Sequence, residues 1–421
     1  MTSKTNIVLL STTIISVFSI NMLVSMSNAI AAENSCVSYN SKENEISISC
    51  KYANFIDIED ELQNQNQTIL YRESTNTTNS FNEKNWILNA GIRVEKDATL
   101  NIDYDDVTWL KIIPSKNTSN AIEVDGSLKV DSVKITSWNP ETDDYVKFPK
   151  DAKYEDSVSA EEIYTSVLRP YIKINTDATG PTIIQNSELA YLGDCSLKTD
   201  NGCSGATGGV TFNGGKYSIL KNNDIHHIFK GFYSKGMGYM LIEGNRVYEN
   251  EIYGIDPHTG THDMIIKDNI VYNNGHIGII CSLDCYNIII EGNEVYNHPS
   301  TGIMFSRNMY DSIARNNYVH DEKKCIFVSD SHNNEIYNNT VSNCDTGILV
   351  HNFAKENKVY NNNIITPERG INVKSGASSN QFHSNNIVDA EEIPISIKKK
   401  DKTNNNIFEK NSIIEGAAFV D

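Results

Sequence analysis

The sequence has little positive charge for its length. Its 421 residues carry 36 Lys and Arg against 54 Asp and Glu, which gives a formal net charge of −18 at pH 7. A protein that binds nucleic acid needs a basic surface that neutralises phosphates. The deficit therefore argues against DNA or RNA as a partner. It also means that a polyanionic substrate would need a locally basic surface.

Three structural patterns are missing as well. Amphipathic helical periodicity is nearly absent, which argues against a helical fold. Leucines do not recur at the spacing of two and three residues that defines leucine-rich repeats. No CxxC pair stands with His at metal-binding spacing, so a zinc site is not predicted. What the chain does contain is short runs of Ile, Val and Tyr, separated by Gly, Asn and Asp.

Residues 1–31 are predicted to be a secretory signal peptide. Lys4 supplies a positive start, the stretch Ile7–Ile20 contains an apolar run, and Ala29-Ile30-Ala31 resembles a small-residue cleavage site. A retained membrane anchor is the alternative, but the run is short and Asn21 interrupts it. We therefore expect a secreted, periplasmic or cell-surface protein whose mature form does not enter a membrane.

All eight Cys follow this segment, and an even number in an exported protein favours disulfides. They fall into four pairs of near neighbours: Cys36 with Cys50, Cys195 with Cys203, Cys281 with Cys285, and Cys325 with Cys344. Sequence alone does not fix this connectivity.

An asparagine recurs nine times at a nearly constant interval. The residues are Asn223, Asn245, Asn269, Asn293, Asn317, Asn339, Asn363, Asn386 and Asn411, which are 22 to 25 residues apart by subtraction of their numbers. Such a period is typical of a solenoid whose coils bury their core only against neighbouring coils. Alternating runs such as IIIEGNEVY are typical of strands. We predict an all-β, right-handed parallel β-helix in which the Asn side chains stack and bond backbone groups.

The predicted organisation is one unit, and we expect a monomer. Residues 32–85 are polar and weakly patterned, which indicates an N-terminal cap and approach segment. The β-helix is predicted over 86–421, with a C-terminal cap from about residue 389. Two insertions, Asn139–Asp156 and Gly193–Gly209, are expected to emerge on one face and to form the walls of a groove.

A second repeat, Gly followed by an apolar residue, runs out of phase with the asparagines. Alternation sends the second and fourth residues after each Gly outward. Neighbouring coils stack about 4.8 Å apart, so these residues should form one outward patch. The expected members are Tyr233, Lys235, Asp256, His258, Ser282 and Arg307.

This patch has the groups needed to remove a proton next to a carboxylate. His258 is the natural base, and Asp256 could orient it or raise its pKa. Lys235 and Arg307 could neutralise the carboxylate, and Tyr233 is the candidate acid. The alternative is that these are ordinary solvated residues on a β-helix face.

The strings YGIDPH at 253–258, IGII at 277–280 and GIMFSRN at 302–308 resemble the mannuronan C5-epimerases of the periplasmic, single-β-helix type. Upstream strings such as VKITSWNP and SELAYLG are also similar to that family. The resemblance implies conversion of β-D-mannuronate to α-L-guluronate within an anionic polymer, without a nucleotide cofactor. It assigns the base to His258 and the first motif Asp to Asp256.

Two positions depart from the family pattern. Thr259 stands where the motif has a second Asp, and Leu283 stands where the family has an Arg that neutralises the carboxylate. Arg307, one coil on, also matches an Arg of the family pattern and could partly substitute. Further residues expected to bind the substrate are Lys230, Lys235, Arg246, Lys267 and Ser282.

Two other functions share these features. A polysaccharide lyase would begin with the same proton abstraction but then expel the 4-linked sugar. A non-catalytic β-helix that binds glycans or builds a surface layer is favoured by Leu283. No cofactor or metal is predicted, although Asp256, Asp263 and Asp284 in neighbouring coils could hold Ca²⁺.

Overall fold

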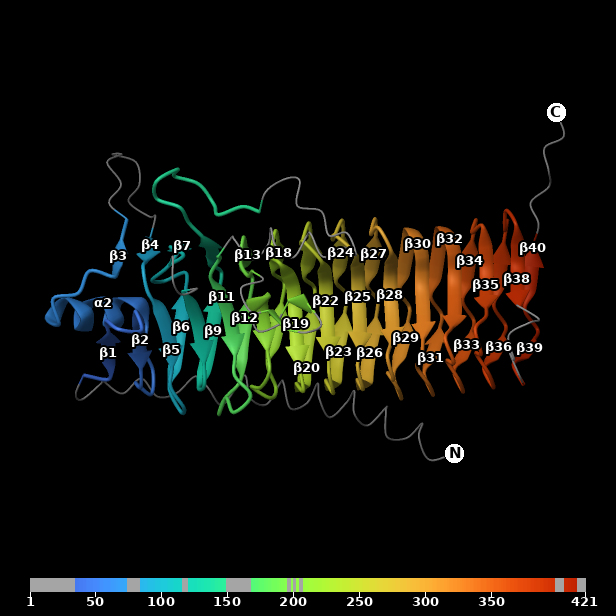
Figure 1. Cartoon of the computed structure of the whole chain (residues 1–421), viewed down its shortest axis with the longest axis horizontal. Helices are drawn as coiled ribbons and strands as arrows, with labels where there is room; N and C mark the ends of the chain where they lie inside the picture. The colour runs from blue at the N-terminus through green and yellow to red at the C-terminus, as the bar shows by residue number, and fades with distance from the viewer. Residues whose placement is uncertain are drawn as a thin grey trace.

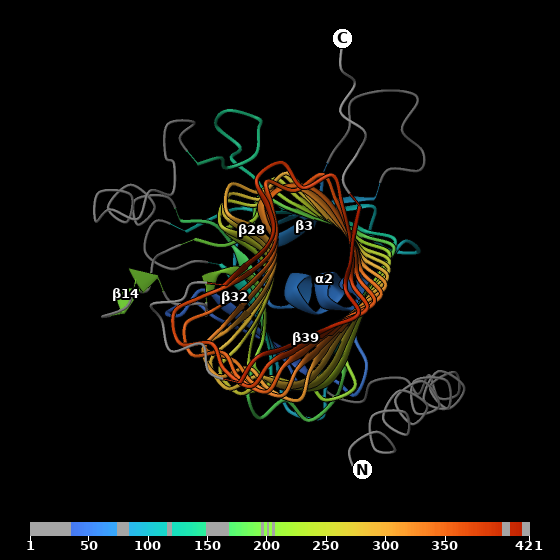
Figure 2. The same ribbon diagram turned by 90° about the vertical axis from the view of Figure 1, so that its right-hand side faces the viewer.

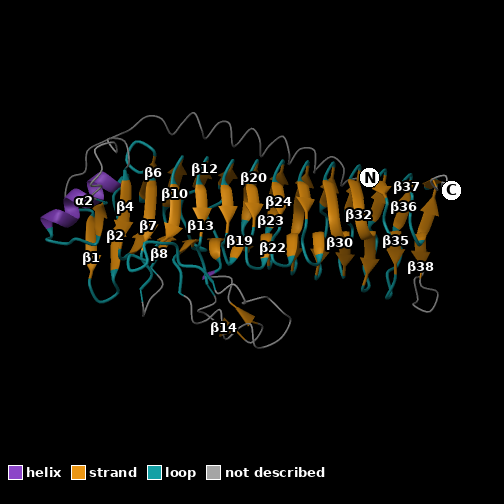
Figure 3. Cartoon of the chain, turned by 90° about the horizontal axis from the view of Figure 1, so that it is seen from above, coloured by secondary structure: helices purple, strands orange, loops and turns teal. Residues whose placement is uncertain are grey.

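The computed structural model describes residues 35–73, 84–115, 120–148, 168–194, 198–199, 202–203, 207–397 and 405–414. Within these ranges the chain forms a row of stacked coils with three strand-bearing faces (Figure 1, Figure 3). Strands of neighbouring coils pair in parallel, as β19 with β22 on one face and β20 with β23 on another. The predicted right-handed parallel β-helix is confirmed.

Each face is a ladder of parallel strands. The first face consists of β2 (Glu45–Ile48), β5 (Gly91–Val94), β8 (Ala121–Val124), β11 (Tyr171–Ile174), β16 (Gly209–Phe212), β19 (Lys230–Lys235), β22 (Tyr253–His258), β25 (Ile277–Ser282), β28 (Thr301–Ser306), β30 (Tyr318–Ser329), β32 (Thr340–His351), β35 (Arg369–Val373) and β38 (Ile393–Ile397). The second face consists of β6 (Thr99–Asp103), β9 (Ser127–Asp131), β12 (Thr182–Gln185), β17 (Ile219–Lys221), β20 (Gly238–Glu243), β23 (His262–Lys267), β26 (Tyr286–Glu291), β29 (Ile313–Arg315), β31 (Glu335–Tyr337), β33 (Lys358–Tyr360), β36 (Gln381–His383) and β39 (Ile407–Glu409). The third face consists of β4 (Asn85–Leu88), β7 (Trp109–Ile112), β10 (Lys134–Ser137), β13 (Glu188–Ala190), β18 (Asp224–His226), β21 (Arg246–Tyr248), β24 (Ile270–Tyr272), β27 (Glu294–Tyr296), the first residues of β30 and β32, β34 (Asn363–Ile365), β37 (Asn386–Val388) and β40 (Ser412–Ile414).

A helix lies at the N-terminal end of the coils. α2 (Phe55–Asn64) begins with a capping box and buries Phe55, Ile58 and Leu62. The ring of Phe55 meets that of Trp86 edge to face, with centroids 5.5 Å apart. Figure 1 places α2 beyond the first strands, and Figure 2, along the coil axis, places it inside their outline. The helix therefore covers the apolar interior at this end.

The coils begin before the predicted boundary at residue 86. β2 already pairs in parallel with β5, so the first face extends back to Glu45. The remaining N-terminal strands pair antiparallel: β1 (Val37–Asn40) with β2, and β3 (Leu70–Arg72) with β4. A short antiparallel hairpin, in which β14 (Lys198–Thr199) and β15 (Gly202–Cys203) have two residues each, lies apart from the coils (Figure 3). The cap and the first coils are thus interleaved in sequence.

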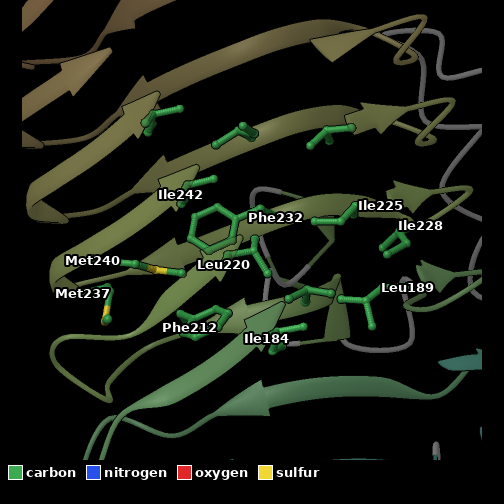
Figure 4. Packing of buried hydrophobic residues seen from close by; sticks show 14 of the residues in the cluster. Ile184, Leu189, Phe212, Leu220, Ile225, Ile228, Phe232, Met237, Met240 and Ile242 are labelled. Atoms are coloured by element: carbon green, nitrogen blue, oxygen red, sulfur yellow. The ribbon is translucent and has the colours of Figure 1, made fainter. Parts of the chain in front are cut away.

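The interior is filled by the inward residues of the three faces. Phe212 and Phe232 of the first face lie with ring centroids 5.6 Å apart. Figure 4 shows them packed with Ile242 of the second face and Ile225 of the third. Because side chains alternate along a strand, the same packing directs the intervening residues outward.

The asparagine ladder is confirmed, with a different register near its end. The side-chain amide of Asn245 donates to Oδ1 of Asn269 at 2.9 Å and to the backbone carbonyl of Leu220 at 2.8 Å. After Asn339 the ladder passes through Asn362 and Asn385 and then reaches Asn411. The predicted members Asn363 and Asn386 are wrong, because they begin β34 and β37, and Asn386 donates instead to the side chain of Asn363.

Two of the four predicted cysteine pairs are disulfides: Cys36 with Cys50, and Cys325 with Cys344. The pair Cys281 with Cys285 is wrong, because both are free thiols in the core. The thiol of Cys285 donates instead to the carbonyl of Ser282 at 3.1 Å.

The described chain keeps its coiled form at the C-terminal end. β38, β39 and β40 pair in parallel with the preceding coil, so the segment predicted as a cap from about residue 389 continues the coils as far as it is described. The predicted signal peptide lies outside the described residues, and so does Cys195 of the remaining predicted pair with Cys203. No helix among the described residues is both long and apolar enough to cross a membrane.

Candidate functional site

The first face brings the predicted patch together over four coils. β19, β22, β25 and β28 pair in parallel, and their register sets Tyr233 beside Asp256 and Lys235 beside His258. The row continues from His258 to Ser282 and on to Ser306. Because one coil follows another at about 4.8 Å, side chains from successive coils are within contact distance.

His258 is half-buried and has a partner at each ring nitrogen. Nδ1 lies 2.6 Å from Oγ1 of Thr259, and Nε2 lies 3.2 Å from Nη2 of Arg307. The ring centroid is 5.6 Å from that of Tyr233. Burial, followed by the positive charges of Arg307, Lys230 and Lys235, lowers the pKa of His258 to about 4. The imidazole is therefore neutral at pH 7.

Arg307 reaches back across two coils to this imidazole. It follows β28 in the left-handed region at φ 51°, and its Nε donates to Oγ of Ser282 at 2.8 Å. Ser282 is fully buried. Its hydroxyl accepts this bond and so holds the guanidinium in place, while its predicted role in substrate binding stays a prediction.

Asp256 is almost completely buried, with 1% of its surface exposed. Neither carboxylate oxygen has a hydrogen-bond partner among the described residues. Burial raises the pKa of Asp256 to about 7, although Lys230 and Arg307 oppose the rise. The expectation that Asp256 orients His258 or raises its pKa is wrong: no hydrogen bond joins them, and the pKa of His258 is lowered.

Lys230 lies near Asp256, and its ammonium group stands over the rings of two tyrosines. The Lys230 ammonium lies 4.7 Å from the ring centroid of Tyr233 and 5.9 Å from that of Tyr253. Burial lowers the pKa of Lys230, whereas burial and the charge of Asp256 raise that of Tyr233. Tyr233 thus keeps its phenolic proton at neutral pH, as a proton donor must.

Two residues predicted to bind the substrate lie on other faces. Arg246 is on the third face, where it pairs with Asp224 at 3.2 Å and donates to the hydroxyl of Tyr272. Lys267 is on the second face, 2.9 Å from Glu243. Each cation is already engaged by a carboxylate, and neither joins the patch around His258.

The three aspartates considered for Ca²⁺ are not gathered into one site. Asp263 contacts His262 and accepts from Asn287, whereas Asp284 accepts from Asn308. The part of the chain that the structure describes holds no group of three His, Cys, Asp or Glu side chains placed to bind a metal.

The corner after each strand of the first face was not anticipated from the sequence. The residue following the last outward position is left-handed in coil after coil, with φ 64° at Gly236, 39° at Thr259, 62° at Leu283 and 51° at Arg307. Leu283 and Arg307 are therefore equivalent positions one coil apart. Gly adopts this conformation freely, but Thr, Leu and Arg do so at a cost. The repeat contained this signal, because the aligned outward residues Lys235, His258, Ser282 and Ser306 are each followed directly by the corner residue.

Comparisons with known proteins agree with this architecture. A family model described as a right-handed β-helix region matches residues 172–319, 208–364 and 280–420, which together cover more than half of the chain. A search of curated protein sequences finds no match.

Solved structures similar to the chain include a periplasmic alginate epimerase, AlgG, with a TM-score of 0.71, 19% identity, and coverage of 88% of this chain and 85% of that one. The A-module of the mannuronan C-5 epimerase AlgE6 from Azotobacter vinelandii gives a TM-score of 0.54 at 14% identity, over 78% of this chain and 88% of that one. A GH136 lacto-N-biosidase from Eubacterium ramulus gives 0.53 at 14% identity, over 87% and 68%. At these identities the likeness is one of fold.

Proposed function

The chain belongs to the right-handed β-helix family, and from this premise we propose that it is an enzyme that epimerises uronate residues at C5 within a polymer, converting β-D-mannuronate to α-L-guluronate. The observation that carries the proposal is the neutral imidazole of His258 held against the guanidinium of Arg307 on the outward first face. A base and a carboxylate-binding cation in contact are what C5 proton abstraction needs. The fold shared with two alginate epimerases supports the same chemistry.

The reaction divides among four side chains. The substrate carboxylate binds the guanidinium of Arg307, with Lys235 beside it. These positive charges neutralise the carboxylate, which makes the C5–H bond more acidic. His258 removes the C5 proton, and the electron pair left behind moves into the carboxyl group. Tyr233 then delivers its phenolic proton to C5 from the opposite side of the ring. Solvent reprotonates Tyr233 and removes the proton from His258.

The substrate is proposed to be an anionic uronate polymer, with the protein exported to the periplasm or cell surface. Lys230 and Lys235 add positive charge beside Arg307, which gives the polymer a local attraction on an acidic protein. Asp256 is proposed to contribute as a buried carboxyl group beside the base, where burial raises its pKa to about 7 and the charges of Lys230 and Arg307 oppose that rise.

Proton NMR of polymannuronate incubated in D₂O tests the proposal. With the purified protein we expect new guluronate signals and deuterium at C5, and none of either with His258→Gln. Thr366→Val, at a corner on another face, serves as the control that should retain activity. Unsaturated chain ends would replace the epimerase with a lyase. No change in polymannuronate or in a panel of mixed uronans would favour a non-catalytic glycan-binding β-helix.

A further inference from the structure

The hydrogen bonds around His258 have a fixed polarity. A guanidinium carries only N–H donors, so the 3.2 Å contact from Nη2 of Arg307 requires Nε2 of His258 to accept. Nε2 therefore presents its lone pair. In a neutral imidazole the single ring proton must then lie on Nδ1.

That proton points at Thr259. Oγ1 of Thr259 is 2.6 Å from Nδ1 and is the only polar partner of that nitrogen among the described residues. The opposite polarity, with the hydroxyl donating to Nδ1, would place the ring proton on Nε2 and set two donors against each other at Arg307.

We propose that Thr259 is a positioning residue whose hydroxyl accepts the Nδ1 proton of His258 and so fixes the tautomer with Nε2 as the free base. This rests on the proposed function in one respect, namely that Nε2 is the atom that receives the C5 proton. When a substrate carboxylate takes the guanidinium of Arg307, Nε2 is released with its lone pair already in place.

The backbone at Thr259 supports this role. A β-branched residue at φ 39° is unfavourable, so the conformation of Thr259 must be held by its surroundings. Two backbone bonds of 2.9 Å hold it there, one from the amide of Gly236 to its carbonyl and one from its amide to the carbonyl of Ser282. The preceding coil has Gly236 at the equivalent corner, where no strain arises. Glycine would fit equally well at residue 259 but would carry no hydroxyl.

The test combines a direct readout of the tautomer with kinetics. The full protein, labelled with ¹⁵N in the histidine rings, is compared by long-range ¹H–¹⁵N NMR at pH 7 as wild type, Thr259→Val and Thr259→Ser. His258→Gln identifies the signal. Thr366→Val is the matched control, because Thr366 is an exposed threonine at another left-handed corner, with φ 46°.

We expect an Nδ1–H tautomer in the wild type and in Thr259→Ser, and a shift toward Nε2–H in Thr259→Val. For Thr259→Val, kcat on polymannuronate should fall about tenfold with little change in KM, which corresponds to the loss of roughly one hydrogen bond. Thr259→Ser should restore the rate, and Thr366→Val should change neither signal nor rate.

Two results would overturn the proposal: an Nε2–H tautomer in the wild type, or a Thr259→Val protein with unchanged tautomer and kcat. If Thr259→Val does not fold, the wild-type tautomer and the Thr259→Ser spectrum still decide the matter. An Nδ1–H tautomer in a protein that turns over no uronan would refute the proposed function and leave the role of Thr259 intact.

Discussion

Asp256 occupies an environment that favours its protonated form. Its pKa in the folded protein is about 7, against an ordinary value of 3.8. Between these values the folded state binds more protons than the unfolded state, so the stability present below pH 3.8 is lost as the pH rises through 7. The side chain of Asp256→Asn cannot ionise, so this variant should not lose that stability. We predict that its free energy of unfolding, relative to that of the wild type, rises by about 2–3 kcal/mol from pH 5 to pH 8. Denaturant unfolding at both pH values measures this gain, and parallel pH dependences would contradict it.

The low pKa of His258 sets the acid limit of the proposed activity. Because the base form persists down to about pH 4, kcat/KM should fall only near that pH and not near the ordinary histidine value of 6.5. Arg307→Gln removes a positive charge beside the imidazole, so the acid limb should move to higher pH while kcat drops. Arg315→Gln is the matched control, since Arg315 pairs with Glu291 on the second face. An acid limb unmoved by Arg307→Gln would mean that another group limits the rate.

The inward–outward alternation of side chains and the length of the coil can both be read from the amino-acid sequence. They were sufficient to place Tyr233, Asp256 and His258 on one surface. They could not show that Asp256 is buried, because burial depends on side chains packed around it and not on the alternation of its own strand. The same limit applies to Ser282, which the pattern places outward but which lies beneath a guanidinium. Periodicity determines on which face of the strand a side chain lies, whereas long side chains from neighbouring coils can determine whether it is covered.

At the scale of elements, the stacked ladders impose a direction on their hydrogen bonds. A second row of stacked polar side chains, Asn250, Asn274, His298 and Glu322, lies at the corners before the strands of the first face. In this row Nδ2 of Asn274 faces Nε2 of His298 at 3.1 Å. The backbone amide of His298 donates to Oε2 of Glu322 at 3.2 Å, and Nδ1 lies 2.5 Å from Oε1. Burial lowers the pKa of His298 to about 3, so it is neutral. The amide group of Asn274 donates to Nε2, so the ring proton of neutral His298 lies on Nδ1. Both oxygens of Glu322 therefore accept, one from Nδ1 and one from the backbone amide, while burial raises the pKa of Glu322 to about 9.

This direction predicts an unusual sensitivity to a nearly isosteric change. Glu322→Gln replaces one acceptor oxygen with an NH₂ group, and every arrangement then sets two donors together somewhere in the ladder. We expect the free energy of unfolding to fall by roughly 1–3 kcal/mol, the typical cost of an unsatisfied buried polar group. Glu335→Gln, on the second face beside Lys358, is the control and should have little effect. Equal stability of the two variants in denaturant unfolding would refute a fixed ladder direction.

The asparagine ladder also shows where the prediction of elements from sequence was wrong. The runs 361–363 and 385–386 offer several asparagines at an acceptable period. The neighbouring apolar residue resolves the choice, because each ladder Asn stands two residues before an inward side chain, as Asn245 does before Val247 and Asn362 before Ile364. That signal was in the sequence. The corner that separates Cys281 from Cys285 was not, since it depends on the left-handed residues Leu283 and Asp284.

At the scale of the whole molecule, repetition determined the fold, and the irregular N-terminal part did not follow from it. α2 and the interleaved strands β1 to β4 carry no period, so their place at the end of the coils depends on tertiary packing, such as that of Phe55 on Trp86. The distribution of charge along the first face is also irregular. Far upstream, Arg93 is held by Glu45, Glu123 and Asp125 at 3.1–3.3 Å. Near His258, the cations Lys235 and Arg307 form no salt bridge with a carboxylate among the described residues.

This contrast predicts how an acidic protein would bind an acidic polymer. With a net charge of −18, long-range attraction is absent, and binding depends on the exposed cations beside His258, which salt screens. KM for polymannuronate should therefore rise with NaCl concentration. Lys235→Ala should raise KM about two- to fivefold at low salt, as expected for one exposed charge, and should flatten the salt dependence. Lys358→Ala, whose lysine is paired with Glu335 on the second face, should change neither. A KM that falls with added salt would instead mean that repulsion between the acidic protein and the anionic polymer outweighs the attraction of the local cations, which would contradict this prediction.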